Sequence, residues 1–254
     1  MRVARDTGTV AGQRHHHRRG RKPGTAVTAD AHRDAELTAL AATAEAVLAE
    51  LRSVALAIKA LVGPVGADLC SANLADADLT RANLAGADLT RANLTRAILA
   101  GADLTRAVMV GTDLQGADLS RADLIRVKLV GAMLCGATLN NANLVRANLY
   151  GADLTGASLN NARLTHADLI SADLRDAILT SADLYGANLT DADLTDADLR
   201  DADLDAANLA QVLWSSGTLW PGDMASLMRD RSEELRPGVW QVAGSGNADA
   251  ETEG

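Results

Sequence analysis

Residues 77–96 read ADLTR ANLAG ADLTR ANLTR, four copies of a five-residue unit with leucine at its centre. The same spacing runs without insertion or deletion from Leu69 to Leu209, which makes 29 consecutive units. Alanine stands two residues before nearly every leucine, and Asp or Asn usually lies between them. A repeat this long indicates an architecture built from one small unit. Within the run, the leucine and alanine positions carry another residue at three places: Met109, Thr112 and Val127.

A step of five residues fits neither regular secondary structure. On an α-helix, at about 100° per residue, successive leucines would point about 140° apart and form no apolar face. On a strand the side chains alternate, so a step of five would place neighbouring leucines on opposite faces. The leucines share one side only if the chain turns within every unit. Repeated turns of one hand wind the chain into a coil, and successive coils stack about 4.8 Å apart.

The units at residues 77–81 and 87–91 follow the pattern A-D/N-L-x-x, which resembles that of the pentapeptide-repeat family. The resemblance implies an all-β solenoid over residues 65–210, a right-handed quadrilateral β-helix with four units per coil. Its 29 units would form about seven coils. Leucine and alanine would point inward, where the small alanine leaves room for the facing leucines. Asp or Asn suits the turns, because both side chains accept hydrogen bonds from nearby backbone amides.

The chain before the repeats divides into two segments. Residues 1–29 are basic and are expected to form a disordered tail. Residues 30–63 predict an amphipathic helix, because apolar residues recur there at steps of three and four. Three roles are open for this helix. It could cap the first coil, as solenoid ends require, it could lie along the rod, or it could dimerise as a coiled coil, since its apolar stripe also fits a heptad.

Residues 211–242 are expected to form a C-terminal cap, and residues 243–254 a disordered acidic tail. The spacing of five continues through Trp214 and Leu219. A helix is predicted from residue 221 to 236 and a strand from 238 to 242. The three tryptophans of the chain all lie in this segment, where they would plug the last coil. Dimerisation through this end is the alternative. The predicted helix would gather four apolar side chains on one side: Met224, Leu227, Met228 and Leu235.

Composition and motifs argue against an enzyme. The chain carries 24 Lys plus Arg against 33 Asp plus Glu, a net charge of −9. We find neither the roughly 18 apolar residues of a membrane span nor a signal peptide. We also find no nucleophile, phosphate-loop or metal-binding motif, and we expect no catalytic residue, cofactor or metal. Cys70 and Cys135 would lie in different coils and are not expected to pair, which favours a cytoplasmic protein.

Charge is distributed unevenly along the repeats. Residues 67–150 hold eight Asp against seven Arg and one Lys, whereas residues 151–210 hold twelve Asp against three Arg. Turn chemistry accounts well for Asp directly before the leucine, but less well for Asp at the two positions after it. A dense acidic surface attracts basic partners. We therefore expect a partner surface formed by Asp173, Asp176, Asp183, Asp191, Asp193, Asp196, Asp198, Asp201, Asp203 and Asp205. With four units per coil, a secondary basic ladder would form from Arg106, Arg126, Arg146 and His166.

These features favour a non-catalytic rod that binds a protein partner or acts as a scaffold. The resemblance implies an alternative, a DNA mimic that binds DNA gyrase or topoisomerase IV and gives resistance to a topoisomerase inhibitor. Such mimics are dimers joined at their C-terminal ends, so a homodimer is one alternative here. This chain lacks the phenylalanines and projecting loops of several of them. Direct nucleic-acid binding is disfavoured, because the repeats are acidic and lack aromatic stacking residues on their faces.

Overall fold

The computed structural model describes residues 35–44 and 66–243. Residues 35–44 form a helix, which falls within the helix predicted over 30–63. The rest of that prediction and the tails expected at residues 1–29 and beyond 243 lie outside the described residues. The chain divides into two units, Met1–Ala49 and Glu50–Gly254, which are described separately. Of the residues described, none belongs to a helix long and apolar enough to cross a membrane.

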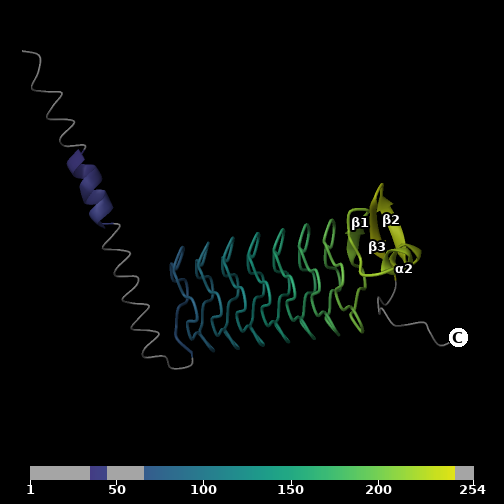
Figure 1. The fold of residues 1–254 in the computed structure, drawn as a ribbon, viewed down its shortest axis with the longest axis horizontal. Coiled ribbons are helices and arrows are strands. Elements are labelled where there is room, and N and C mark those ends of the chain that lie inside the picture. Colours follow the sequence, from purple (N-terminus) through teal and green to yellow (C-terminus); the bar gives the residue numbers. More distant parts are fainter. Residues whose placement is uncertain (1–34, 45–65, 244–254) are drawn as a thin grey trace, which may run out of the picture. The chain divides into compact units, whose positions relative to one another are not determined.

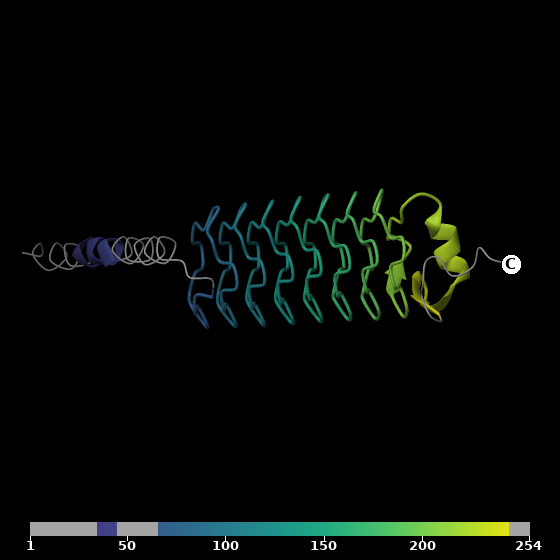
Figure 2. The ribbon, with the colours of Figure 1, turned by 90° about the horizontal axis from the view of Figure 1, so that it is seen from below.

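The repeats form a stack of coils in which residues twenty apart lie side by side (Figures 1 and 2). Parallel bridges begin with Asp68 and Asp88 and continue in the same register to Asp193 and Leu213. Each bridge has two backbone hydrogen bonds: the Asp88 amide donates to the Ala67 carbonyl at 2.9 Å, and the Leu69 amide to the Asp88 carbonyl at 2.7 Å. A spacing of twenty residues gives the four five-residue units per coil that the family resemblance implied.

The interior of the coils is filled by the leucines and by the alanines two residues before them. From Ala87 to Leu209 every one of these positions is buried, which confirms the inward assignment. Removal of each leucine from water contributes roughly 1.5–3 kcal/mol. Thr112 is accommodated at an alanine position because its hydroxyl donates to the Leu89 carbonyl at 2.8 Å. The repeats therefore hold together as one continuous aliphatic core.

A tight turn separates successive units. In the unit around Leu79, the Ala82 amide donates to the Leu79 carbonyl at 2.9 Å, which closes a four-residue turn. The Asp78 carboxylate accepts the Thr80 amide at 3.0 Å, and this contact recurs in many other units. Arg81, the third residue of the turn, has φ of 56°, as a type II turn requires. Glycine occupies the same position elsewhere, as in Gly101, because it adopts positive φ without steric cost.

The repeat register shifts by one residue after Trp214. The spacing of five placed Leu219 inside, but Leu219 pairs with Asp198, twenty-one residues before it, and its side chain is 44% exposed. Trp220 takes the inward position instead and is only 5% exposed. Thr218 fills the alanine position, where its hydroxyl donates to the Leu194 carbonyl at 2.8 Å. The turn before Thr218 therefore holds one additional residue, which the sequence spacing did not reveal.

The C-terminal segment combines three strands with a short helix (Figure 1). Strand β1 is Leu213–Ser215, helix α2 is Met224–Asp230, β2 is Ser232–Arg236 and β3 is Val239–Val242. The strands form an antiparallel sheet in the order β1-β3-β2.

The predicted strand at residues 238–242 is confirmed as β3, but the predicted helix was too long. Residues 232–236 pair with β3, because the chain reverses through Pro237 and Gly238 and Gly238 adopts φ of 77°. The apolar side chains assigned to one helix face are therefore divided. Met228 is buried and Met224 packs against the core, whereas Leu227 and Leu235 are 45% and 56% exposed.

Tryptophan side chains pack together beside the last coil. The Trp214 and Trp240 rings stack with centroids 4.7 Å apart, and Trp220 meets Trp214 edge-on at 5.8 Å. Trp214 Nε1 donates to the Ser232 hydroxyl at 2.9 Å, which links the inward Trp214 side chain to β2. The Arg229 guanidinium lies 4.5 Å from the centre of the Trp240 ring. In this arrangement the Trp214 and Trp220 side chains are buried.

Enlarging an inward alanine tests the packing of the coils. We expect Ala142→Leu to destabilise the protein by about 1–3 kcal/mol, because the closed interior has no space for three more carbon atoms. The melting temperature, followed by circular dichroism, should fall by several degrees. Val130→Leu is the control, since it adds a methylene at an outward position. Equal melting temperatures for the two variants would contradict the inward assignment of Ala142.

Candidate functional site

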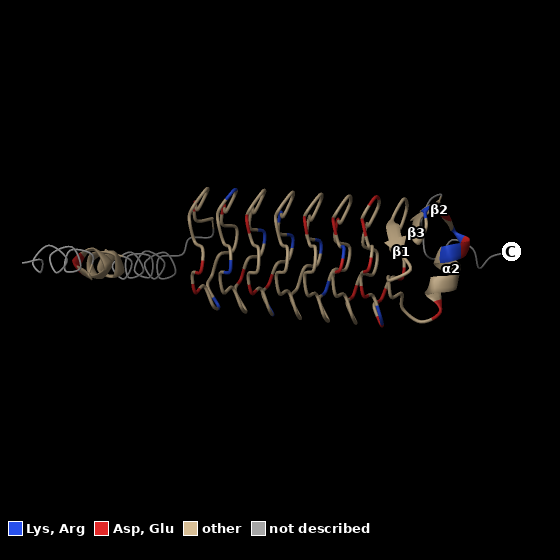
Figure 3. Ribbon diagram, turned by 90° about the horizontal axis from the view of Figure 1, so that it is seen from above, with Lys and Arg blue, Asp and Glu red and all other residues tan. Residues whose placement is uncertain are grey.

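The ten predicted aspartates encircle the last coils and do not form one patch. Residues twenty apart stack, and residues five apart occupy neighbouring sides of the coil. Figure 3 marks the charged positions along the ribbon. One side carries Asp173, Asp176, Asp193 and Asp196; the next carries Asp198 and Asp201; the third carries Asp183, Asp203 and Asp205; and the fourth carries Asp191.

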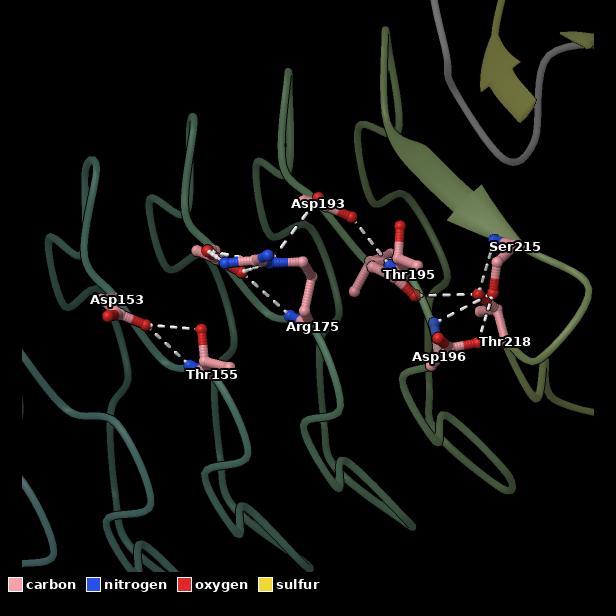
Figure 4. Close-up of polar contacts among 10 residues, drawn as sticks. Asp153, Thr155, Arg175, Asp193, Thr195, Asp196, Ser215 and Thr218 are labelled. Carbon is pink, nitrogen blue, oxygen red and sulfur yellow. Dashed lines mark hydrogen bonds and ion pairs between the residues drawn. The ribbon is translucent and has the colours of Figure 1, made fainter. Parts of the chain in front are cut away.

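Two arginines neutralise part of this acidic band. Arg175 Nε donates to Asp173 at 2.8 Å, and the same nitrogen lies 3.9 Å from an Asp193 carboxylate oxygen. Arg175 thus interacts with carboxylates of two adjacent coils, and Figure 4 shows it beside Asp193. Arg200 pairs with Asp198 in the same manner, through Nη2 and Oδ2 at 2.6 Å. These three aspartates belong to local ion pairs.

Two further aspartates make structural hydrogen bonds. The Ser215 hydroxyl donates to Asp196 Oδ1 at 2.7 Å and accepts the Asp196 amide at 3.1 Å (Figure 4). Gly217 also donates its amide to Ser215 Oγ at 3.1 Å, so Asp196 is tied to the turn that holds the additional residue. In the coil before it, the Thr165 hydroxyl donates to Asp183 Oδ2 at 2.8 Å.

Four of the ten aspartates are exposed, and their carboxylates take no part in the ion pairs and hydrogen bonds described above. Within residues 66–243, the side chains of these four form no ion pair and accept no hydrogen bond: Asp176, Asp191, Asp201 and Asp205. Asp203 differs from them, because it accepts the Asp205 amide at 3.0 Å as an ordinary turn residue does. The structure therefore reduces the predicted surface to four carboxylates distributed over the four sides of the last coils.

The secondary basic ladder is brought together as predicted. Its four side chains stand at the same turn position of successive coils and line an open groove with a volume of about 640 Å³: Arg106, Arg126, Arg146 and His166. Thr105, Ile125 and Val145 also line this groove. These three were missed from the sequence, although their own spacing of twenty residues would have identified them. The His166 ring meets Tyr185 edge-on at 5.7 Å.

Metal-binding and thiol groups are sparse in the described part of the chain. There, no three His, Cys, Asp or Glu side chains gather where they could hold a metal ion. Cys70 and Cys135 are both exposed and unpaired, which agrees with the expectation that they form no disulfide.

The arginine pairs lower the pKa of their partner carboxyls. The hydrogen bond from Arg175 is the largest cause at Asp173, and that from Arg200 is the largest at Asp198; burial opposes both. A lowered pKa means that the folded state holds its proton less tightly than the unfolded state. Each pair therefore contributes stability above the ordinary carboxyl pKa of 3.8 and loses it as pH falls through the lowered value.

Removal of Arg175 tests this dependence. In Arg175→Gln the pKa of Asp173 should rise, because its hydrogen-bonded cation is gone and burial remains. The midpoint of acid unfolding, followed by circular dichroism, should move to higher pH. Arg121→Gln is the control, since Arg121 is exposed and, within residues 66–243, makes no ion pair. The account is wrong if both variants unfold at the pH of the parent protein.

Substitution of two aspartates that lie one coil apart distinguishes a carboxylate that stabilises the fold from one that is only exposed. Asp196→Ala should destabilise the C-terminal turn by roughly 1–3 kcal/mol, because the Ser215 hydroxyl loses its acceptor. Asp176→Ala, at the same turn position of the preceding coil, should leave the melting temperature nearly unchanged. Thermal unfolding of the two variants measures the difference, and a similar loss in both would refute the distinction.

A pentapeptide-repeat family model matches the chain with eight copies in overlapping segments that span residues 72–212. No curated protein matches significantly. Among solved structures, Rfr23 of the cyanobacterium Cyanothece 51142 is 34% identical over 37% of this chain and 63% of its own, with a TM-score of 0.36. The match thus spans less than two thirds of Rfr23.

HetL, a pentapeptide repeat protein involved in heterocyst differentiation regulation in Nostoc sp. strain PCC 7120, is 32% identical over 60% of this chain and 87% of its own, with a TM-score of 0.26. QnrB1, a plasmid-mediated fluoroquinolone resistance protein, is 21% identical over 65% and 88% of the two chains, with a TM-score of 0.42. The family model covers more than half of the residues, and its repeats coincide with the stacked coils. The chain therefore belongs to the pentapeptide-repeat family, whose members form right-handed quadrilateral β-helices.

Proposed function

We propose that this chain is a non-catalytic rod that binds a protein partner through its acidic C-terminal coils. The observation that carries the proposal is the presence of four exposed carboxylates that, within the described residues, form no direct ion pair and accept no hydrogen bond: Asp176, Asp191, Asp201 and Asp205. Of these, Asp201 interacts electrostatically with Arg200 without contact. Neighbouring aspartates are paired with arginine, hydroxyl or amide groups, whereas the carboxylates of these four are left to face solvent. Unpaired surface charge of one sign steers and orients a partner of the opposite sign.

The surface of the repeats supports a binding role over a catalytic one. The units follow one another without an inserted loop from residue 67 to 210, so the outward positions lie on flat ladders. Enzyme sites are usually concave and enclosed, whereas the groove beside Arg126 is partly open to solvent. The two exposed thiols are suited to a reducing compartment, and we propose a cytoplasmic location.

A second candidate is the DNA mimic that binds DNA gyrase or topoisomerase IV and gives resistance to a topoisomerase inhibitor. The distribution of the aspartates over all four sides favours it, because a rod surrounded by carboxylates presents negative charge in every direction, as a polyanion does. Residues 151–210 hold twelve Asp against three Arg, which concentrates this charge in the last coils.

Charge removal at the two ends of the rod tests the proposal. The end variant combines Asp176→Asn, Asp191→Asn, Asp201→Asn and Asp205→Asn. The control combines Asp88→Asn, Asp103→Asn, Asp118→Asn and Asp123→Asn, which removes the same charge from earlier coils. Each protein is used for affinity purification from the native host with quantitative mass spectrometry. We expect partners enriched by the parent and control to fall about fourfold or more with the end variant, since each of four exposed pairs contributes roughly 0.2–1 kcal/mol.

Purified gyrase separates the two candidates. Inhibition of supercoiling by the parent and the control, but not by the end variant, would favour the DNA mimic. If the parent leaves supercoiling unchanged at equimolar amounts, the mimic is excluded. Recovery of the same proteins in the same amounts by both variants would overturn the acidic end as the binding surface.

A further inference from the structure

The groove on the basic side of the rod carries charge that the fold does not use. We call it the arginine groove: Arg106, Arg126 and Arg146 form its charged wall, and Thr105, Ile125 and Val145 stand beside them. The groove extends from Gly86 to His166, which is four coil steps, or about 19 Å at the stacking distance of about 4.8 Å. It therefore matches an extended ligand that lies along the rod.

The three guanidinium groups repel one another, and within the described residues no carboxylate holds any of them in an ion pair. Like charges on adjacent strands are destabilising, and none of the three forms an ion pair within residues 66–243. Two carboxylates share this side in the coils that form the groove, and within the described residues each accepts a turn amide and forms no ion pair. Asp103 accepts the Thr105 amide at 2.9 Å, and Asp123 accepts the Ile125 amide at 3.3 Å. A ligand with carboxylates at regular intervals would relieve the repulsion.

The lining of the groove favours a peptide over a nucleic acid. Ile125 and Val145 present aliphatic surface beside the guanidinium groups, whereas single-stranded nucleic acids need aromatic rings on which bases stack. The imidazole ring of His166 lies at the end of the groove, where it meets the Tyr185 ring edge-on. The His166 ring also lies where a side chain on Gly186 would be, since a Cβ there would fall 2.5 Å from Nδ1. This pair limits the groove toward the C-terminal coils.

The chain itself contains a segment with the required pattern. Residues 244–254 read GSGNADAETEG, with acidic side chains at alternate positions: Asp249, Glu251 and Glu253. In an extended chain, alternate residues point to the same side. Three carboxylates would therefore face one wall, and the Gly-Ser-Gly sequence before them is typical of a flexible connection.

The connection is long enough to reach the groove. Val242 is held beside the last coil, because its amide donates to the Val212 carbonyl at 3.0 Å. Val212 lies about three coils beyond Arg146, and the one unit at residues 207–211 separates their two sides of the rod, which gives a distance of roughly 20 Å from the coil spacing and the length of that unit. Seven extended residues from Val242 to Asp249 span about 23 Å.

The spacing within the segment also agrees with the groove. From Asp249 to Glu253 an extended chain covers about 13 Å, and two coil steps from Arg146 to Arg106 cover about 10 Å. We propose that the arginine groove is a binding site for an extended acidic peptide, and that residues 244–254 of this chain occupy it. In this arrangement Asp249, Glu251 and Glu253 pair with Arg146, Arg126 and Arg106. The inference does not depend on partner binding by the acidic coils, because the arginine groove is formed by other side chains.

Competition between the attached segment and a free peptide tests the proposal. A fluorescent peptide with the sequence of residues 244–254 is titrated with full-length protein at low ionic strength, and anisotropy reports binding. The tail variant carries Asp249→Asn, Glu251→Gln and Glu253→Gln. It should bind the peptide about tenfold more tightly than the parent, because an attached segment competes at an effective concentration near the millimolar range.

Two further proteins locate the site, both built on the tail variant. The groove variant adds Arg106→Gln, Arg126→Gln and Arg146→Gln, and it should lose at least about tenfold in affinity. The control adds Arg81→Gln, Arg91→Gln and Arg121→Gln, which occupy the same turn position on other sides. Glutamine suits these turns, since Gln211 has φ of 60° there, and thermal unfolding verifies that each protein is folded. The control should bind like the tail variant.

Three results would overturn the inference. Equal affinity of the parent and the tail variant would show that the attached segment does not occupy the site. Equal affinity of the groove variant and the control would place peptide binding elsewhere. Tighter binding of a single-stranded DNA with the same charge than of the peptide would assign the groove to nucleic acid instead.

Discussion

A turn closed by one backbone hydrogen bond recurs in every unit, and the rest of the structure depends on it. In the unit around Leu79 the bond joins the Ala82 amide to the Leu79 carbonyl, and Arg81 between them has positive φ. A left-handed conformation costs a residue with a side chain roughly 1–2 kcal/mol. The bridges to the coils before and after hold both ends of the turn, so the cost is met by cooperative stacking.

The coil interior and the turns were accessible from the sequence because each unit repeats the same chemistry. Leucine and alanine mark the inward side, and Asp78 marks a turn, wherever they occur. The structure at the end of the repeat could not be predicted from the sequence in this way. The additional residue before Thr218 leaves no periodic signal, and residues 232–236 have a helical composition but gain their hydrogen bonds from β3. In both places tertiary contacts override the local pattern.

For the charged surface too, the sequence predicted where the residues lie but not which residues they contact. The register located every aspartate and arginine on a side of the rod, and the stacking of Arg106, Arg126 and Arg146 follows from it. It did not reveal that Arg175 interacts with both Asp173 and Asp193, because that contact depends on how one side chain bends back along its own turn. Nor did it reveal that Ile125 and Val145 make the basic ladder one wall of a groove.

The spacing of twenty residues has a consequence for length changes in this rod. Loss or gain of a whole coil would shorten or lengthen the rod by about 4.8 Å and leave every side-chain column aligned. Loss or gain of a single unit would instead rotate everything that follows by a quarter turn about the axis. Each column downstream would then continue a different column upstream, although the leucine core would remain intact. Surface patterns on such a rod therefore tolerate changes of twenty residues far better than changes of five.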